Sequence, residues 1–215
     1  LKSFIMGKYF GTDGIRGPVG GDLINTDVAY RLGSALGRYM KQFKPELPLN
    51  AVIGRDTRLS GPELSGALIQ GLNQHGVYVH DLGIVPTPSV AQSLLEQQAD
   101  IGIAVTASHN PASDNGIKLF GPDGYKLSDD IEAAIASLID EDLASRMPTG
   151  AEIGRAKRVD GDIYRYIEFA KRTLPRELSL DGMRIAIDCA NGAGYRVAPE
   201  VLWELGAEIV KIGVE

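Results

Sequence analysis

The residues best suited to chemistry lie in one stretch, "AVTASHNPASDNGIKLFGPDGYKL", residues 104–127. It places Ser108, His109 and Asn110 side by side, and Lys118 follows in the same stretch. A serine hydroxyl can act as a nucleophile, a histidine as a general base, and a lysine as a proton carrier or an anion clamp. The plain alternative is that Ser108 and Asn110 cap a turn and that Lys118 is an ordinary surface lysine.

A serine nucleophile activated by the neighbouring histidine is not favoured. Neighbouring side chains on an extended backbone point to opposite sides, so we expect Ser108 and His109 to point apart. The sequence also lacks a GxSxG motif, which would place a serine on a sharp strand-to-helix turn. The residues alone therefore leave the chemistry of Ser108 open.

Two further polar clusters could belong to the same site. The stretch "FGTDGIRG" contributes Asp13 and Arg16, and "GRDTRLSG" contributes Arg55 and Arg58. Each could be only a structural turn. Together they could bring several guanidinium groups near one site, where their paired N–H donors would suit phosphate.

Alternating helices and strands must position these residues. Residues 26–43 carry apolar side chains at helical spacing, with Asn25 or Thr26 as the N-cap, and Ser60 and Glu63 are spaced as a capping box. The other expected elements are strands over 49–56, 77–83 and 99–107, and helices over 60–76, 88–98 and from Ser128. This alternation predicts an α/β fold with a mixed, mainly parallel sheet between helices. Ligands of such sheets gather where strands end, and Ser108 comes just past a strand.

The chain is expected to contain one domain and the start of another. Residues 1–6 are expected to be an N-terminal extension, with the natural start at Leu1 or Met6 left open, and residues 7–145 a first domain. Residues 146–157 lose apolar periodicity and contain Pro and Gly, which predicts a linker. Residues 158–215 read as helix, strand, loop, helix and strand, too little to bury both faces of a sheet. We therefore expect an incomplete second domain, similar to the first.

Composition excludes several classes of protein. The chain has 215 residues, a net charge of −6 at pH 7 and a single cysteine, Cys189. The acidic balance argues against a general nucleic-acid or anionic-membrane binder, and one cysteine excludes an intramolecular disulfide. No apolar run reaches membrane-spanning length, and "LKSFIMGKYF" is too quickly polar for a signal peptide. We therefore expect a cytoplasmic protein.

Five motifs, taken in order, resemble those of the α-D-phosphohexomutase family. They are "KYFGTDGIRG", "GRDTRLSG", "GIVPTPSVA", "TASHNP" and "DNGIKLFGPDGYKL", and the resemblance runs from Gly7 to Glu215. The phosphomannomutase and phosphoglucomutase branch usually has Gly before its serine and a different opening, whereas this chain has Ala107 and "FGTDGIRG". The resemblance therefore favours the bacterial branch that acts on glucosamine phosphate.

The resemblance implies an enzyme that interconverts glucosamine 6-phosphate and glucosamine 1-phosphate. Ser108 would be a phosphoserine that donates its phosphoryl group to the sugar and takes the other one back, and its phosphate would ligate Mg²⁺. Lys118 matches the family's acid/base lysine, Arg16 the arginine that supports it, and His109 a residue of the catalytic loop. The residues expected to bind phosphate or substrate are Thr12, Asp13, Arg55, Arg58, Asn110 and Asn115.

Motifs that the family uses to complete its site are absent from this sequence. These are the "DGDGDR" magnesium loop, the "GExSGH"-type sugar loop and the "RxSGTEP"-type phosphate loop, so residues 1–215 are expected to be inactive alone. The nearest look-alike is "VDGDIYRY", where Tyr164 stands in place of a third carboxylate. Asp160 and Asp162 are therefore interpreted as acidic residues at a helix N-terminus.

The implied partner is a hexosamine phosphate substrate, with no nucleic acid and no membrane, and a homodimer is left open. The alternatives are a phosphomannomutase or phosphoglucomutase, and a non-catalytic sugar-phosphate-binding protein. His75, His80 and Cys189 have no second ligand at a metal-like spacing, and we expect them to be structural.

Overall fold

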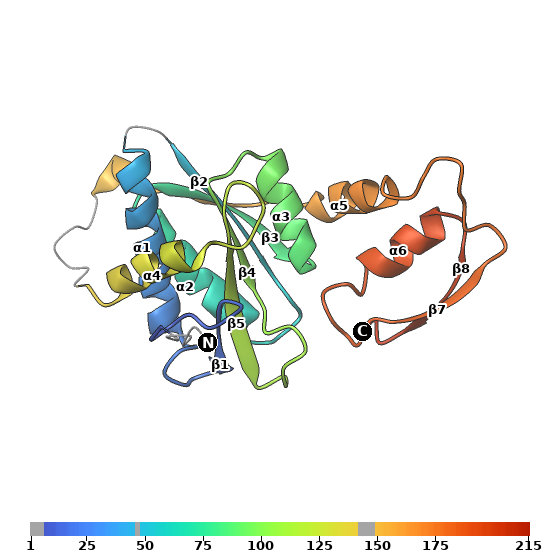
Figure 1. Cartoon of the computed structure of the whole chain (residues 1–215), viewed down its shortest axis with the longest axis horizontal. Helices are drawn as coiled ribbons and strands as arrows, with labels where there is room; N and C mark the ends of the chain where they lie inside the picture. Colours follow the sequence, from blue (N-terminus) through green and yellow to red (C-terminus); the bar gives the residue numbers. More distant parts are fainter. Residues whose placement is uncertain (1–6, 46–47, 142–148) are drawn as a thin grey trace, which may run out of the picture.

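The computed structural model describes residues 7–45, 48–141 and 149–215, which form two sheets flanked by helices (Figure 1). The strands are β1 (Ile15–Pro18), β2 (Leu49–Arg55), β3 (Val77–Ile84), β4 (Ile101–Val105), β5 (Asp114–Phe120), β6 (Ala156–Arg158), β7 (Arg184–Asp188) and β8 (Glu208–Ile212). The helices are α1 (Thr26–Phe43), α2 (Gly61–Asn73), α3 (Thr87–Glu96), α4 (Asp129–Ile139), α5 (Asp162–Lys171) and α6 (Val197–Glu204), with a 3₁₀ turn at Gly150–Glu152. The expected extension and the first residues of the expected linker, 146–148, lie outside the described residues.

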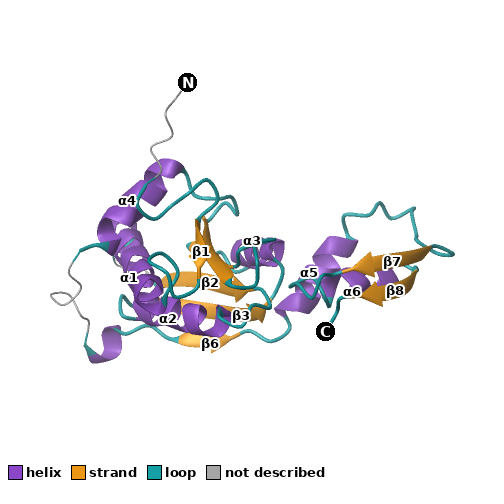
Figure 2. Cartoon of the chain, turned by 90° about the horizontal axis from the view of Figure 1, so that it is seen from below, coloured by secondary structure: helices purple, strands orange, loops and turns teal. Residues whose placement is uncertain are grey.

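The larger sheet has the strand order β1-β5-β4-β2-β3-β6. Strands β4, β2, β3 and β6 are parallel, whereas β5 is antiparallel to both β4 and β1. Helices α1, α2 and α4 cover one face of the sheet, and α3 covers the other (Figure 2). The prediction of a mixed, mainly parallel sheet between helices is confirmed.

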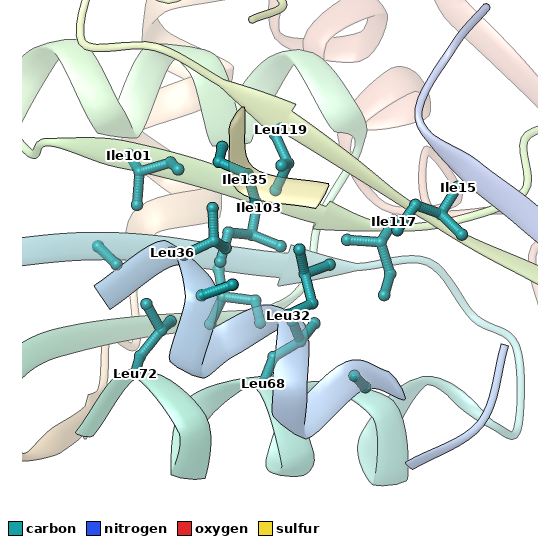
Figure 3. Packing of buried hydrophobic residues seen from close by; sticks show 14 of the residues in the cluster. Ile15, Leu32, Leu36, Leu68, Leu72, Ile101, Ile103, Ile117, Leu119 and Ile135 are labelled. Carbon is teal, nitrogen blue, oxygen red and sulfur yellow. The ribbon is translucent and has the colours of Figure 1, made fainter. Parts of the chain in front are cut away.

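The main core lies between the sheet and the three helices on one face. Leu32 of α1, Leu68 of α2 and Ile135 of α4 meet Ile103 and Leu119 from the central strands, and all five are fully buried (Figure 3). Burying each such side chain contributes about 1.5–3 kcal/mol. This packing holds β4 and β5, and therefore the loop between them, on a rigid base.

Helix α1 begins as the sequence indicated. Asn25, not Thr26, is the N-cap: its Oδ1 accepts a hydrogen bond of 2.9 Å from the backbone N–H of Val28. A side-chain acceptor here satisfies one of the N–H groups that a helix leaves free at its start.

The capping box predicted for α2 is wrong. Ser60 does precede the helix, but its backbone already has helical angles, and its side chain makes no capping hydrogen bond. Its hydroxyl instead accepts a hydrogen bond of 2.8 Å from Nδ2 of Asn115, far along the chain in β5. A tertiary contact has replaced the local one.

Two edge strands were not predicted. Strand β1 pairs antiparallel with β5, and β6 pairs in parallel with residues 79–81 of β3. Ala156 and Lys157, expected in the linker, therefore extend the larger sheet. Such short strands show too little alternation to be recognised in a sequence.

Beyond the larger sheet, the chain forms the β-α-β arrangement expected from its sequence. Strands β7 and β8 are parallel, with α6 between them in the chain, and they lie at the far end of the molecule from α1 (Figure 1). Helix α5 joins the two parts and packs against α3 and α6. Within the described ranges, no helix has both the length and the apolar character needed to cross a membrane.

Candidate active site

The backbone of Ser108 has an unusual conformation for a serine. It lies in the serine loop, residues 106–113, which connects the buried end of β4 to β5. Its φ of 56° is in the left-handed region, which costs a non-glycine residue about 1 kcal/mol or more. The left-handed turn leaves Ser108 exposed directly after the buried Ala107. Ser108 is therefore at a strand end, as predicted, and is held in a conformation that the surrounding contacts must maintain.

The expectation that Ser108 and His109 point apart is wrong. Ser108 Oγ lies 3.4 Å from Nδ1 of His109. The expectation assumed an extended backbone, whereas the left-handed Ser108 brings its side chain to the same side as that of its neighbour. At this distance the hydrogen bond is weak, so His109 contacts the Ser108 hydroxyl but does not fix its orientation.

A series of hydrogen bonds connects the serine loop to the end of β2. The backbone N–H of Ser108 donates to Thr106 Oγ1 at 3.0 Å, and the Thr106 hydroxyl donates to Asp56 Oδ2 at 2.7 Å. Asp56 follows β2, so this series links the ends of two neighbouring parallel strands. Sequence reasoning missed both residues, although an acidic residue between two arginines in "GRDTR" was a usable signal.

The guanidinium group of Arg58 is fully occupied. Its Nε donates to Asp56 Oδ2 at 3.0 Å, and its side chain is only 9% exposed. Its two terminal nitrogens donate to four carbonyl oxygens of the loop and the start of β5, at 2.6–3.0 Å: those of Ser108, Asn110, Pro111 and Asp114. Arginine has five N–H donors, so none remains for a ligand. The expected phosphate-binding role of Arg58 is therefore corrected.

A cavity of about 990 Å³ opens beside Ser108. Its lining comes from the carboxyl ends of β2, β3 and β4, from the serine loop and from residues 189–193 after β7. Thr57 Oγ1 donates a hydrogen bond of 2.6 Å to the carbonyl of Asn191, which joins two sides of this lining. The cavity lies at strand ends, where the alternation of elements predicted a ligand site.

Among the described residues that line the cavity, Arg55 is the arginine whose N–H groups make no hydrogen bond. Its side chain is 19% exposed, and its nearest carboxylate, Asp81, is 3.9 Å away, too far for a strong hydrogen bond. A guanidinium group at a cavity wall can bind a phosphate through two parallel N–H groups. Its position is compatible with phosphate binding, and the role that the sequence predicts for Arg55 stays a prediction.

A second charged cluster, consisting of Asp13, Arg16 and Lys118, lies beside the cavity without lining it. Lys118 Nζ is 2.8 Å from Asp13 Oδ2, and Arg16 also donates to that oxygen. Lys118 pairs with Ala104 of β4, which does line the cavity, so the two side chains project from the same face of the sheet. The hydrogen bond from Lys118 lowers the pKa of Asp13, which keeps this carboxylate charged.

Three other predicted residues have different positions. Asn110 lies in the serine loop and lines the cavity, and its Nδ2 donates a hydrogen bond of 3.0 Å to Asp114, the first residue of β5. Asn115 is fully buried, with its amide bonded to Ser60 and to the N–H of Gly116. Asn115 therefore joins β5 to the residue before α2 and does not face the cavity. The structure does not support the binding role predicted for it. Thr12 is exposed in the turn before β1.

The described residues hold no group of three or more His, Cys, Asp or Glu side chains that could bind a metal ion. Asp162, from the "VDGDIYRY" look-alike, is instead a buried helix-start residue that accepts hydrogen bonds from Ser89 and Ser93 of α3. Ser108 could supply one metal ligand through a phosphate, but the described residues do not complete a site around it.

Comparison with known proteins extends over almost the whole chain. Residues 7–146 match the family model described as phosphoglucomutase/phosphomannomutase, alpha/beta/alpha domain I. Over 97% of the chain, it is 58% identical to a phosphoglucosamine mutase of Agrobacterium fabrum and 55% identical to one of Xanthobacter autotrophicus. The chain covers 46% of each, so it spans about half the length of these curated relatives.

Two solved structures resemble the chain over 94% of its length. A phosphoglucomutase/phosphomannomutase family protein of Burkholderia thailandensis is 31% identical, with a TM-score of 0.76 over 94% of this chain and 43% of the other. A putative phosphomannomutase of Thermus thermophilus is 27% identical, with a TM-score of 0.79 over 94% of this chain and 45% of the other.

Proposed function

Because the chain belongs to the phosphoglucomutase/phosphomannomutase family, we propose that it is part of a phosphoglucosamine mutase. Such an enzyme interconverts glucosamine 6-phosphate and glucosamine 1-phosphate. The observation that carries the proposal is Ser108: an exposed serine, held in a left-handed turn, at the mouth of a cavity formed by strand ends. The relatives named phosphoglucosamine mutase support the choice of sugar.

In this proposal Ser108 carries the phosphoryl group that is transferred. A sugar hydroxyl attacks the phosphorus of phospho-Ser108, the bond between phosphorus and Ser108 Oγ breaks, and a bisphosphorylated sugar forms. The sugar turns over, Ser108 Oγ attacks its other phosphorus, and the monophosphate product leaves with the phosphoserine restored. Such transfers depend on alignment and charge neutralisation more than on covalent chemistry by the protein.

Lys118 is proposed to move the proton that the attacking hydroxyl loses and the leaving oxygen gains. Asp13, 2.8 Å from Lys118 Nζ, orients the ammonium group, and Arg16 shares the same carboxylate. His109 lies beside Ser108 Oγ and is proposed to shape its surroundings. Arg55 is proposed to clamp a phosphate from the cavity wall.

Mg²⁺ is the proposed cofactor, with the phosphate on Ser108 as one ligand. When bound, it would neutralise negative charge on the transferred phosphoryl group. The described residues contain no cluster that would complete a metal site around this phosphate.

The proposed domain division is 7–145 for the first domain, 146–157 for the linker and 158–215 for part of the second. Residues 1–215 alone are proposed to be inactive.

The runner-up is a phosphomannomutase or phosphoglucomutase. The likeness to the solved structure of a putative phosphomannomutase from Thermus thermophilus is the observation that favours it. Turnover of glucosamine 6-phosphate, mannose 6-phosphate and glucose 6-phosphate by the full-length protein separates the two.

We also propose that the enzyme is cytoplasmic, and leave a homodimer as the assembly to be tested.

The deciding experiment uses the full-length protein. Intact mass and peptide mapping should show one phosphate on Ser108, and a coupled assay should show formation of glucosamine 1-phosphate. Ser108→Ala should lose both the phosphate and nearly all activity, whereas Ser137→Ala, on the exposed face of α4, should keep both. Ordinary steady-state turnover by Ser108→Ala would contradict the proposal.

A further inference from the structure

We infer that Arg58 is a positioning residue, which holds Ser108 in its left-handed conformation and thereby aims the Ser108 hydroxyl into the cavity. The inference rests on the proposed function for its kinetic consequences, although the structural part can be tested without it. It assigns to Arg58 a role different from phosphate binding.

The first support is the set of groups that Arg58 joins. One side chain, from the turn after β2, binds the carbonyl oxygens of Ser108 and Asn110 through one terminal nitrogen. The other terminal nitrogen binds the carbonyls of Pro111 and Asp114. Four carbonyl oxygens of the serine loop and the start of β5 thus accept hydrogen bonds from one planar guanidinium group, whose geometry fixes the directions of its N–H donors.

The second support is charge and burial. A guanidinium group that is 9% exposed needs a counter-charge, and Asp56 supplies it through Nε of Arg58 at 3.0 Å. Asp56 also accepts the hydroxyl of Thr106, which in turn accepts the N–H of Ser108. Arg58 therefore reaches Ser108 from two sides: directly at its carbonyl, and through Asp56 and Thr106 at its N–H.

The third support is the strain at Ser108. A left-handed serine turns over to an extended or helical conformation unless its neighbours oppose that change. The backbone angles of Ser108 set how its N–H and its carbonyl are oriented relative to each other, and these two groups are held by Thr106 and by Arg58. A change of the Ser108 conformation would therefore break at least one of the two hydrogen bonds. A lysine at position 58 would keep the charge but has neither the planar shape nor enough donors for four carbonyls.

The test compares Arg58→Lys and Arg58→Ala with wild type in the full-length protein, using glucosamine 6-phosphate. Misplacing a reacting group by about 1 Å can lower a rate about 10²-fold, so we expect kcat to fall about 10²-fold in both variants, counted per phosphorylated Ser108. KM should stay within about threefold of the wild-type value. Adding guanidinium ion to Arg58→Ala should raise the kcat of this variant at least tenfold. Arg31→Lys, on the exposed face of α1, is the matched control and should behave as wild type.

Hydrogen exchange provides a readout that does not need activity. Amides of residues 107–114 should exchange at least tenfold faster in Arg58→Lys, while amides of α1 and α2 keep their wild-type rates. If Arg58→Lys does not fold, Asp56→Asn, which removes the counter-charge, should show the same loss of kcat and the same faster exchange.

Each other outcome overturns one specific statement. A raised KM with wild-type kcat would make Arg58 a phosphate-binding residue, and wild-type exchange in the serine loop would remove its positioning role. An inactive wild-type protein would refute the proposed function, and the exchange rates would still decide whether Arg58 holds the loop.

Discussion

The ammonium nitrogen of Lys118 lies 2.8 Å from a carboxylate oxygen of Asp13. Asp13 precedes β1 and Lys118 lies in β5, so the antiparallel pairing of these two strands brings the charges together. The pair lies next to the cavity at Ser108, because Lys118 is paired with the cavity residue Ala104. This contact between Lys118 and Asp13 therefore depends on two segments far apart in the sequence.

Lys118→Ala should lower kcat of the full-length enzyme by about 10²-fold or more, because it removes the group proposed to transfer a proton. Steady-state kinetics with glucosamine 6-phosphate measure it. Lys41→Ala, exposed on α1, is the control and should retain wild-type kcat. A change confined to KM would make Lys118 a binding residue only.

Asp13→Asn should lower kcat by about tenfold and alter the pH profile, because Lys118 loses its charged partner. The sign follows from the lowered pKa of Asp13: its ion pair is fully present above the usual aspartate pKa and is lost as pH falls through the lowered one. At neutral pH the wild-type pair is therefore intact. A pH–rate profile identical to that of wild type would argue against this role.

Gly71→Ala should destabilise the packing of α1 and α2 on the larger sheet, because these two helices touch at Gly71 through their backbones. A Cβ at Gly71 would lie 2.2 Å from the carbonyl oxygen of Tyr30, a contact that the two helices can relieve only by moving apart. We expect a loss of about 2–3 kcal/mol in denaturant unfolding. Gly66→Ala in the same helix, where a Cβ meets nothing within 4 Å, should be neutral or stabilising by about 0.5–1 kcal/mol.

His75 should make the protein less stable in mild acid. It is buried against Ser34, with 2.7 Å between its Nε2 and the hydroxyl, and burial is the main cause that lowers its pKa to about 4. The unfolded chain takes up a proton near pH 6.5, which the folded state resists until about pH 4. Stability is therefore fully present above about pH 6.5 and falls between about pH 6.5 and 4, by about 3 kcal/mol.

Urea unfolding at several pH values measures this effect. His75→Gln should be less stable than wild type at pH 8 but should lose less stability across that acid window. An equally steep loss in His75→Gln would assign the pH dependence to other groups.

Asp162→Ala should loosen α5 from α3, because its buried carboxylate accepts hydrogen bonds from Ser93 at 2.8 Å and from Ser89 at 3.2 Å. Ser93 keeps the hydrogen bond that it accepts from Gln97, but both buried hydroxyls lose their acceptor, which costs about 1–3 kcal/mol each. Hydrogen exchange of α5 in the full-length protein should rise accordingly. Asp160→Ala, whose side chain is exposed, should leave that exchange at the wild-type rate.

The sequence by itself determined the elements whose pattern is local. The spacing of Leu32 and Leu36 marks the buried face of α1, and Asn25 caps this helix. The apolar residues before Ser108 form a buried strand, as their sequence predicted. These predictions are confirmed because hydrophobic periodicity and capping act over a few neighbouring residues. The motifs around Ser108 and Lys118 likewise pointed to the family.

The tertiary structure alone decided which groups are free. The sequence of "GRDTRLSG" does not show that the N–H groups of Arg58 donate to carbonyl oxygens of the serine loop. It also does not show that the Ser60 hydroxyl accepts a hydrogen bond from Asn115 and does not cap α2. The left-handed turn that brings Ser108 towards His109 also depends on such contacts. These partners lie about fifty residues apart, and only the packing of β2, β4 and β5 side by side brings their donors and acceptors within hydrogen-bond distance.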